Sequence, residues 1–384
     1  MTNTDSPMRI LLVTTGLRMG GAEQQVSALT QEFIARGHRV ALISLTPDCE
    51  VPIPDAVERL MLDMQKTPAS MACALGAAHR FARRWRPDIV NSHMFHANMF
   101  ARTLARLTDL PPLICAAHSF SEGGKLRMAM YRFTDRWCAL TTQVSETSLA
   151  EMVRARAVAR DRVRVMYNGI DTVKFQRDDA LRATTRTQLG LDSDTRMILN
   201  IGRLATEKAQ VALVDAFQRM DCTVPTRLLI AGDGPQRPAL ASRIAHHGQQ
   251  HRIQLLGTRH DIPALLNAAD LFALSSRVEG MPLVLAEALA CECPVVSTSA
   301  PGVAELLGDL GTIVPIDDLD GLAREMCRFL TNDDRASVQR RTGRERIVKH
   351  FGIAAAADRW LALYRQVISA APDHAGHAHP CADA

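Results

Sequence analysis

The sequence predicts an α/β protein made of two doubly wound, parallel-sheet domains. Its 384 residues are too many for one ordinary domain of roughly 150 residues, so two or three domains are expected. Short apolar runs alternate with helix-like spacers over residues 8–167, and the same alternation restarts over residues 197–315. Buried strands that alternate with crossover helices are typical of parallel sheets. Hydrophobic residues make up 47% of the chain and charged residues 22%, which is enough apolar material for more than one core.

The first series begins with a βαβ unit. An apolar run over residues 8–15 ends at glycines, a helical stretch follows over 22–36, and a second apolar run occupies 39–45. Later strands of this domain are predicted at residues 88–92, 113–117, 140–144 and 163–167. We expect residues 1–175 to form the first domain, with residues 1–7 flexible.

The second series predicts six strands, at residues 197–201, 227–231, 253–256, 271–274, 294–297 and 312–315. They belong to a domain expected over residues 197–350, which a polar connector over 176–196 separates from the first. Residues 351–369 are expected to form a C-terminal helix that packs back toward the first domain. The Ala-, Pro- and His-rich end, 370–384, has too few apolar residues to pack and is expected to be disordered.

Composition argues against several classes of protein. No stretch approaches the roughly 18–20 uninterrupted apolar residues that cross a bilayer, and no apolar segment precedes a cleavage site, so we expect a cytoplasmic protein. The nine cysteines form no CxxC pair and are expected to be small core residues rather than zinc or dithiol ligands. Aromatic residues are only 4% and no basic stretch interleaves them, which disfavours nucleic acid as a partner.

The net charge of +4 is distributed unevenly. Residues 1–175 hold 22 Lys and Arg against 16 Asp and Glu, whereas the remainder holds 23 against 25. A basic first half favours an anionic partner such as a phosphorylated lipid or a membrane surface, and a solvated basic face is the alternative.

Glycines and charged residues follow several predicted strands, at the sheet edge where ligands bind in open parallel sheets. Behind the first strand, Gly20 and Gly21 open a helix that also carries Glu23. Backbone N–H groups at such a helix start can face an anion, and a plain tight turn is the alternative. The spacing is not GxGxxG, so a nicotinamide cofactor is disfavoured.

The second domain begins with two fixed cations. Gly202 and Arg203 close its first strand and Lys208 follows five residues later, an arrangement suited to neutralising a diphosphate. A solvated basic loop is the alternative. After the next strand, the segment 232–235, which begins with Gly232, predicts a tight turn that permits close backbone approach, or a purely structural turn.

The segment 275–288 is the most informative. After a predicted strand the chain turns at Gly280, and Pro282 fits the first turn of a helix whose free N–H groups then face the crevice. The sequence therefore predicts an anion site at this helix start. Glu279 lies in the loop before the helix and Glu287 within it, where a carboxylate could accept two hydrogen bonds from a vicinal diol such as ribose; two solvated carboxylates are the alternative.

Five segments in order make the chain resemble the retaining glycosyltransferases of family four, which have the two-domain GT-B fold. Glu279 and Glu287 resemble the family's E-x7-E motif, and residues 202–204 with Lys208 resemble its GRL...K diphosphate loop. The other three are similar to its N-terminal glycine motif (20–23), NGxD segment (168–171) and GDGP turn (232–235). The resemblance covers about residues 8–330 and implies two Rossmann-like domains that face a central cleft.

The resemblance also implies roles for individual residues. The expected catalytic residues are His118, Arg203, Lys208 and Glu279. The expected donor-binding residues are Gly20, Gly21, Gly202, Arg203, Lys208, Gly232, Gly280, Met281, Pro282, Leu283 and Glu287. The acceptor-side candidates are Glu23, His93 and His96. No metal or other cofactor is expected, because the two cations would do a metal ion's work.

The sequence departs from the family pattern at a few positions. Ala209 and Glu292 stand where glycine is usual, and the pair 301–302 is Pro-Gly rather than two glycines. Two Asp-x-Asp stretches, 192–194 and 318–320, suggest the metal motif of the other glycosyltransferase fold. Neither follows a nucleotide-binding strand in the required place, so both are expected to be surface loops.

Residues 125–137 predict an amphipathic helix. Four apolar residues share one face at i, i+4, i+7 and i+11 spacing: Leu126, Met130, Phe133 and Trp137. Three cations cluster elsewhere: Lys125, Arg132 and Arg136. The apolar face could dock on a membrane, or it could pack against the first domain's sheet, which is the commoner use of such a helix.

The sequence as a whole predicts a retaining, metal-independent glycosyltransferase. We expect a nucleotide-diphosphate-sugar donor, UDP-linked, and a glycan or lipid-linked glycan acceptor held mainly by the first domain. The enzyme would act in the cytoplasm, at the inner face of the cytoplasmic membrane if its basic domain contacts anionic lipid. Two alternatives stay open: a UDP-sugar 2-epimerase of the same fold, and a catalytically idle nucleotide-sugar-binding subunit.

Overall fold

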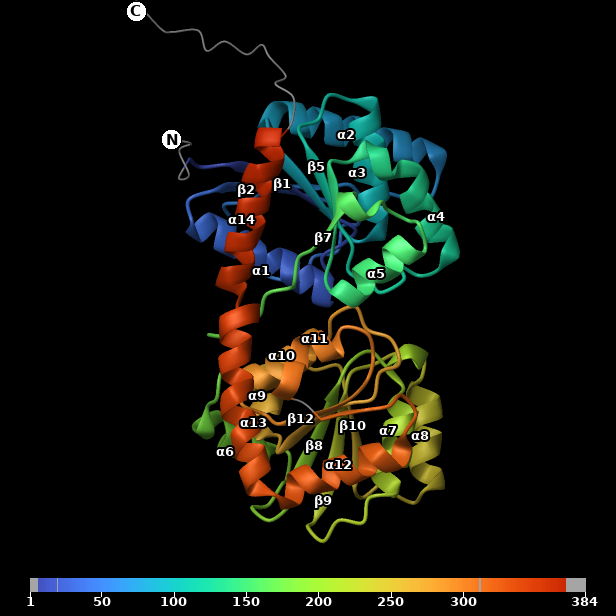
Figure 1. The fold of residues 1–384 in the computed structure, drawn as a ribbon, viewed down its shortest axis with the longest axis vertical. Coiled ribbons are helices and arrows are strands. Elements are labelled where there is room, and N and C mark those ends of the chain that lie inside the picture. The colour runs from blue at the N-terminus through green and yellow to red at the C-terminus, as the bar shows by residue number, and fades with distance from the viewer. Residues whose placement is uncertain (1–5, 19, 311, 371–384) are drawn as a thin grey trace, which may run out of the picture.

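The computed structural model describes residues 6–18, 20–310 and 312–370, which form two α/β domains stacked along the long axis (Figure 1). The N-terminal domain is built on a parallel sheet of order β3-β2-β1-β4-β5-β6-β7. Its strands are β1 (Arg9–Thr14), β2 (Arg39–Ser44), β3 (Glu58–Met61), β4 (Ile89–His93), β5 (Leu113–Ala116), β6 (Leu140–Gln143) and β7 (Val163–Val165). The order reverses between β1 and β4, so the crevice for ligands lies beyond their carboxyl ends.

Both faces of this sheet are covered, which explains why its central strands are continuous apolar runs. One face packs against α1 (Gly21–Ala35) and α14 (Ile353–Ala370), and the other against α2 (Pro68–Trp85) and α3 (Phe95–Leu107). Alternate residues of one strand therefore enter different cores: Ile10 and Leu12 contact the first, Leu11 and Val13 the second.

The C-terminal domain repeats the plan with a parallel sheet of order β10-β9-β8-β11-β12-β13. Its strands are β8 (Arg196–Ile201), β9 (Thr226–Ala231), β10 (Ile253–Gly257), β11 (Leu271–Leu274), β12 (Val295–Thr298) and β13 (Thr312–Val314). The covering helices include α7 (Gln210–Gln218), α8 (Arg237–His246), α9 (Ile262–Ala268), α10 (Leu283–Ala290), α12 (Leu319–Thr331) and α13 (Asp333–Arg346). The predicted fold class of two doubly wound domains is confirmed.

The range expected to be a connector contains a helix, α6 (Asp179–Gln188), that belongs to the C-terminal domain. Its side chains Arg182 and Arg186 donate to the two carboxylate oxygens of Asp270, at 2.6 and 3.0 Å. Asp270 is buried and also accepts from the backbone N–H of Met197 at 2.7 Å. Because both of its oxygens accept hydrogen bonds, this buried carboxylate anchors α6 to the start of β8.

The C-terminal helices run across both domains (Figure 1). After α13, a π-helical turn η5 (Ile347–Phe351) leads into α14, which packs along the N-terminal domain. The crossing is tight at Gly169, where a Cβ would approach the Cα of Ile353 to 2.7 Å. Farther along α14, Tyr364 donates to the Oδ1 of Asn91 in β4 at 2.7 Å. The tail expected beyond residue 370, and most of the expected flexible start, lie outside the described residues.

The amphipathic segment forms α4 (Lys125–Thr134) and a short 3-10 turn, η1 (Asp135–Trp137). The helix buries Met128 and Tyr131 toward its own domain. Leu126 and Phe133 on the other side are 77% and 76% exposed. Of the two alternatives for the Leu126 face, packing against the sheet is therefore wrong, because the inward contacts come from Met128 and Tyr131 on the opposite side of the helix.

Candidate active site

The strongest polar contact in the cleft joins Lys208 and Glu279. Lys208 ends the 3-10 turn η3 (Thr206–Lys208) after β8, and its Nζ lies 2.7 and 2.8 Å from the carboxylate oxygens of Glu279. Glu279 lies in the loop between β11 and α10 and is only 8% exposed. Ser276 donates to the same carboxylate at 2.6 Å. The fold thus brings Lys208 and Glu279, two of the four predicted catalytic residues, to the carboxyl ends of two neighbouring strands.

Arg203 lies on the same β8 loop but is turned to solvent. Its side chain is 67% exposed and its guanidinium donates to Glu207 at 2.5 Å. The loop rests on the GDGP turn, where Gly232 has a positive φ of 134° and a Cβ would collide with the carbonyl oxygen of Gly202. Only glycine fits at Gly232, so the backbone of this turn can pack directly against the loop that carries Arg203 and Lys208.

The two domains meet at the predicted donor loop. A Cβ on Gly280 would collide with the carbonyl oxygen of His118 in the N-terminal domain, and a Cβ on Gly21 would lie 3.1 Å from Leu283 at the start of α10. The first glycine motif and the His118 loop therefore face the loop of Glu279 across the cleft. Pro282 directly precedes α10, so the unpaired N–H groups of its first turn lie at this junction. Met281 is buried beneath them.

Glu287 lies one to two turns into α10 and is partly buried. Burial raises the pKa of its carboxyl to about 7, and nearby Lys174 only partly opposes the shift. Within the described part of the chain it has no hydrogen-bond or ion-pair partner. A half-buried carboxyl without a protein partner can accept hydrogen bonds from a ligand diol.

The buried His93 and the partly buried His118 form a pair on the N-terminal side. The Nδ1 of His93, at the end of β4, lies 3.1 Å from the Nε2 of His118, which follows β5. Burial lowers the pKa of His118 to about 4 and that of His93 well below 6.5. Both rings are therefore neutral at pH 7, and the second nitrogen of each lacks a partner in the described structure. His96 lies exposed on α3, outside this pair.

The other acceptor-side candidate, Glu23, lies in the first turn of α1. Its carboxylate folds back over Gly20, where a Cβ would collide with it. Burial raises the pKa of Glu23 above its ordinary value. The glycine motif thus makes room for this carboxylate as well as for the contact of Gly21 with α10.

Two carboxylates near the cleft were not identified from the sequence. Glu122 is buried on the loop of His118, with a positive φ of 49°, and accepts from the backbone N–H of Ser119 at 2.8 Å. Burial raises its pKa to about 6. Glu305 of the C-terminal domain accepts from the backbone N–H groups of Glu146 and Thr147, at 2.7 and 2.8 Å, and so caps α5 (Glu146–Arg154) across the domain boundary. No sequence motif marks either residue.

The Asp-x-Asp stretches have structural uses. Asp192 accepts from the backbone N–H of Thr195 at 2.7 Å in a turn, and Asp318 accepts from Gly321 at 2.8 Å as the N-cap of α12. Among the described residues, no group of three or more His, Cys, Asp or Glu side chains is arranged to hold a metal ion. No described helix is long and apolar enough to cross a membrane.

Comparison with known proteins defines the class. A sequence model described as Glycosyltransferase Family 4 matches residues 19–174, and one described as Glycosyl transferases group 1 matches residues 195–332. These matches are to models of glycosyltransferase families, and the arrangement of the two domains is that of the GT-B fold. The chain belongs to the family 4 type of GT-B glycosyltransferases.

Individual relatives are distant. N-acetyl-alpha-D-glucosaminyl L-malate synthase of Bacillus anthracis is 25% identical over 242 residues, which is 62% of each chain. Alpha-D-kanosaminyltransferase of Streptomyces kanamyceticus is 28% identical over 246 residues, again 62% of each, so the chain spans less than two thirds of both relatives. 2-Deoxystreptamine glucosyltransferase of the same organism is 24% identical over 94% of this chain and 98% of its own.

Solved structures show the same fold. Anabaena HepE in complex with UDP and glucose superposes with a TM-score of 0.82 at 19% identity, over 94% of this chain and 100% of that one. At this identity the likeness establishes the fold and leaves the substrate open.

Proposed function

We propose that the protein is a retaining glycosyltransferase that moves a sugar from a UDP-sugar to an acceptor hydroxyl without a metal ion. The observation that carries this proposal is the Lys208–Glu279 pair, held beside the start of α10 and opposite His118. A cation and the free N–H groups of a helix start suit a diphosphate, and a carboxylate beside them suits sugar hydroxyls.

Donor binding would break the ion pair between Lys208 and Glu279. The diphosphate takes Lys208 and the N–H groups of α10, which releases the carboxylate of Glu279 to accept hydrogen bonds from the donor sugar. Arg203, exposed on the same loop, can swing onto the diphosphate from solvent. Glu287 is placed to hold the ribose diol.

In the proposed reaction the acceptor oxygen attacks the anomeric carbon on the face from which the diphosphate leaves. The bond from that carbon to the phosphate oxygen breaks, and the acceptor proton passes to the departing diphosphate. Lys208 and Arg203 stabilise the negative charge that develops on the leaving group. The neutral His118, opposite Gly280, can donate to or accept from the transferred sugar.

The acceptor is proposed to be a glycan or lipid-linked glycan bound by the N-terminal domain, at the inner face of the cytoplasmic membrane. The excess of basic residues in this domain supports an acceptor or surface that carries phosphate. Relatives include UDP-Gal:alpha-D-GlcNAc-diphosphoundecaprenol alpha-1,3-galactosyltransferase of Escherichia coli, 25% identical over 77% of this chain, whose name gives a lipid-linked glycan acceptor.

A donor screen tests the proposal. The protein would be incubated with individual nucleotide sugars and a lipid-linked glycan extract, and nucleotide release and the anomeric configuration of the product would be measured by mass spectrometry and NMR. We expect one UDP-sugar to be consumed with its configuration retained. Inversion at the anomeric carbon, or an epimerised UDP-sugar formed without acceptor, contradicts the proposal.

A further inference from the structure

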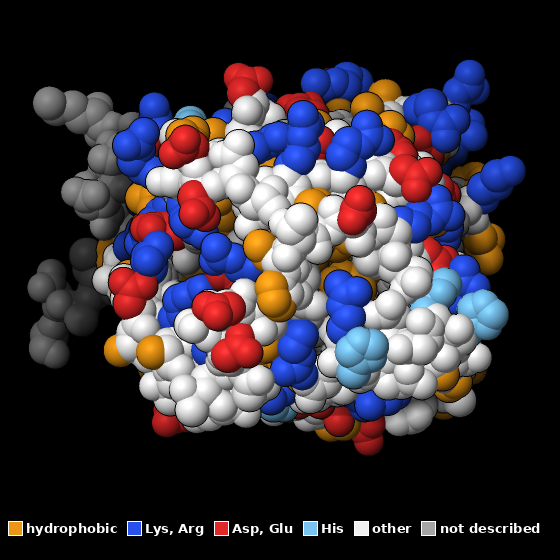
Figure 2. Space-filling model, turned by 90° about the horizontal axis from the view of Figure 1, so that it is seen from below, with side chains coloured by type: hydrophobic (Ala, Val, Ile, Leu, Met, Phe, Trp, Pro, Cys, Tyr) orange, Lys and Arg blue, Asp and Glu red, His pale blue; other side chains and the backbone are white. Residues whose placement is uncertain are grey.

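The exposed side of α4 carries a row of large apolar side chains. Leu126 and Phe133 are the most exposed of its large apolar side chains, Met130 between them is 40% exposed, and Trp137 in η1 extends the row. These four residues define the α4 stripe. By contrast, Figure 2 shows acidic and basic side chains interspersed over the end of the C-terminal domain, as on an ordinary solvated surface. An exposed apolar row of this size indicates contact with something other than water.

The α4 stripe is bordered by cations that have no counter-ion. Lys125, Arg132 and Arg136 lie one position ahead of the stripe residues along the helix, and all three are exposed. None of them has an ion-pair or hydrogen-bond partner among the described residues. The one acidic residue between 125 and 137, Asp135, is already paired with Arg162 at 3.0 Å. The surface therefore combines apolar area with unneutralised positive charge.

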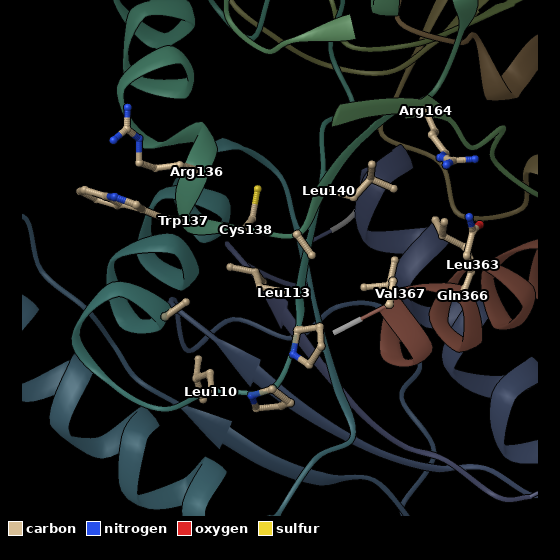
Figure 3. Close-up of a pocket in the computed structure, with 15 residues that line it drawn as sticks. Leu110, Leu113, Arg136, Trp137, Cys138, Leu140, Arg164, Leu363, Gln366 and Val367 are labelled. Atoms are coloured by element: carbon tan, nitrogen blue, oxygen red, sulfur yellow. The ribbon is translucent and has the colours of Figure 1, made fainter. Parts of the chain in front are cut away.

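A groove of about 610 Å³ continues this surface beyond Trp137. Its lining is largely apolar and includes Leu110, Leu113 and Val367. Figure 3 shows Arg136 with Trp137 on one side of the groove and Arg164 on the other. Arg164 is exposed and also lacks an acidic partner within the described chain. An apolar floor between two free guanidinium groups is complementary to an amphiphile with an anionic head.

The inner side of α4 connects this surface to the cleft. Tyr131, fully buried beneath the helix, donates to Glu122 at 3.3 Å, and Glu122 belongs to the loop that begins at His118. Lys125 begins the helix directly after that loop. The Leu126 end of the α4 stripe is therefore the end nearer the cleft, and the Trp137 end leads away from it to the groove.

We propose that the α4 stripe, its bordering cations and the adjoining groove dock the protein on an anionic phospholipid bilayer. The apolar side chains enter the boundary between headgroups and acyl chains, and the cations bind lipid phosphates. The occupant is a bilayer rather than a protein partner because the free charge is of one sign and follows the whole length of the apolar row. This surface lies outside the cleft, and docking requires no donor.

The test measures binding of the full chain to vesicles of phosphatidylcholine alone and with 30% phosphatidylglycerol. We expect binding to the anionic vesicles that weakens at high salt. The double variant Leu126→Ser/Phe133→Ser should bind at least about tenfold more weakly. Its control, Val173→Ser/Val338→Ser, changes two exposed valines elsewhere and should bind like the unmodified protein. All four side chains are more than half exposed, so both variants should fold, and their melting temperatures check this.

Two further experiments test the role of the cations and the depth to which the apolar row enters the bilayer. Lys125→Glu/Arg132→Glu should lose at least about tenfold in binding, whereas Arg324→Glu/Arg341→Glu, with the same charge change on α12 and α13, should lose much less. Brominated lipid should quench Trp137, because the other two tryptophans, Trp85 and Trp360, are only 4% exposed. Trp137→Phe should remove the quenching.

Several results overturn the inference. In the first, the unmodified protein fails to bind anionic vesicles; in the second, the Leu126→Ser/Phe133→Ser variant binds them as well as the unmodified protein does. In the third, that variant converts a dimer to a monomer, which would assign the α4 stripe to contact with a second copy of the chain. Sugar transfer to a water-soluble acceptor is measured in parallel. Vesicle binding without transfer would refute the proposed function alone, and transfer without vesicle binding would refute the docking surface alone.

Discussion

The Nζ of Lys208 lies 2.7 Å from the Oε1 of Glu279, a residue 71 positions later in the chain. The two side chains come from loops after β8 and β11, neighbouring strands at the point where the strand order of the C-terminal sheet reverses. Parallel topology brings the ends of these strands to one edge, so the pair forms at the place where such sheets bind ligands. The ion pair holds the cation in position before any ligand arrives.

If Lys208 and Glu279 act as a unit, their mutational effects should not add. Lys208→Met and Glu279→Gln should each lower kcat/KM by about 10²–10³, and the double variant should fall little further than either single one. A double-mutant cycle on UDP release measures this. The matched control is the surface pair Arg219 and Asp320, 2.9 Å apart, whose Arg219→Met/Asp320→Asn variant should keep full activity. Fully additive losses in the cleft pair contradict the assignment.

Glu287 makes stability depend on pH. Burial raises the pKa of its carboxyl to about 7 from an ordinary 4.5, so ionisation in the folded protein costs free energy that the unfolded chain does not pay. This cost is absent below pH 4.5 and complete above pH 7. Glu287→Gln should therefore become more stable than the unmodified protein as pH rises from 4.5 to 8, by on the order of 1–3 kcal/mol.

Urea unfolding at several pH values measures the effect of Glu287→Gln, with Glu345→Gln on the exposed side of α13 as the control. The same substitution should weaken UDP binding about tenfold if the carboxylate holds ribose. A stability difference that stays constant with pH would show that the carboxyl is not destabilised by burial.

The buried pair of His93 and His118 should resist protonation. Because burial lowers the pKa of His118 to about 4 and that of His93 well below 6.5, both rings should be neutral at pH 6. The unfolded chain takes up these protons first, so the pair stabilises the fold above pH 6.5 and its contribution is lost as pH falls toward 4. Nitrogen-15 NMR of the imidazoles reports both protonation and tautomer. An imidazolium signal from either ring at pH 6 would refute the neutral pair.

Ala209 occupies a backbone conformation that favours glycine. Its φ of 51° and ψ of 37° are left-handed, at the junction of η3 and α7, so the Cβ is strained there. Ala209→Gly should stabilise the protein by about 0.5–1 kcal/mol, whereas Ala212→Gly inside α7 should destabilise it by about 1 kcal/mol. Thermal unfolding distinguishes the two. A loss of stability in Ala209→Gly would show that contacts of the methyl group outweigh the strain.

The sequence predicted the strands that contain an apolar run, and it missed one edge strand that does not. β1 and β2 each contain four consecutive apolar residues, whereas β3 at the sheet edge reads Glu-Arg-Leu-Met, is half exposed and has no such run. The sequence also did not show why the family usually has glycine at the position of Glu292. Its φ of 57° explains why glycine is usual there, but backbone conformation is not visible from residue type.

Contacts between distant residues limited the prediction of the site. Lys208 and Glu279 were each assigned from local motifs, and their ion pair follows from strand order, which the sequence implies only through the fold. Glu305 and Glu122 were missed because each accepts from backbone N–H groups, and such contacts leave no trace in residue identity. The orientation of α4 was left open between two alternatives, because periodicity defines two faces without showing which one is buried.

Nucleotide release in EDTA tests the central claim most directly. The protein and its Lys208→Met variant would be incubated with UDP-sugars and acceptor extract, and UDP would be quantified with EDTA and then with added Mg²⁺ or Mn²⁺. The account predicts undiminished release in EDTA and a loss of about 10²–10³ in the variant. Release that stops in EDTA and returns with the metal, or that does not depend on Lys208, would contradict it.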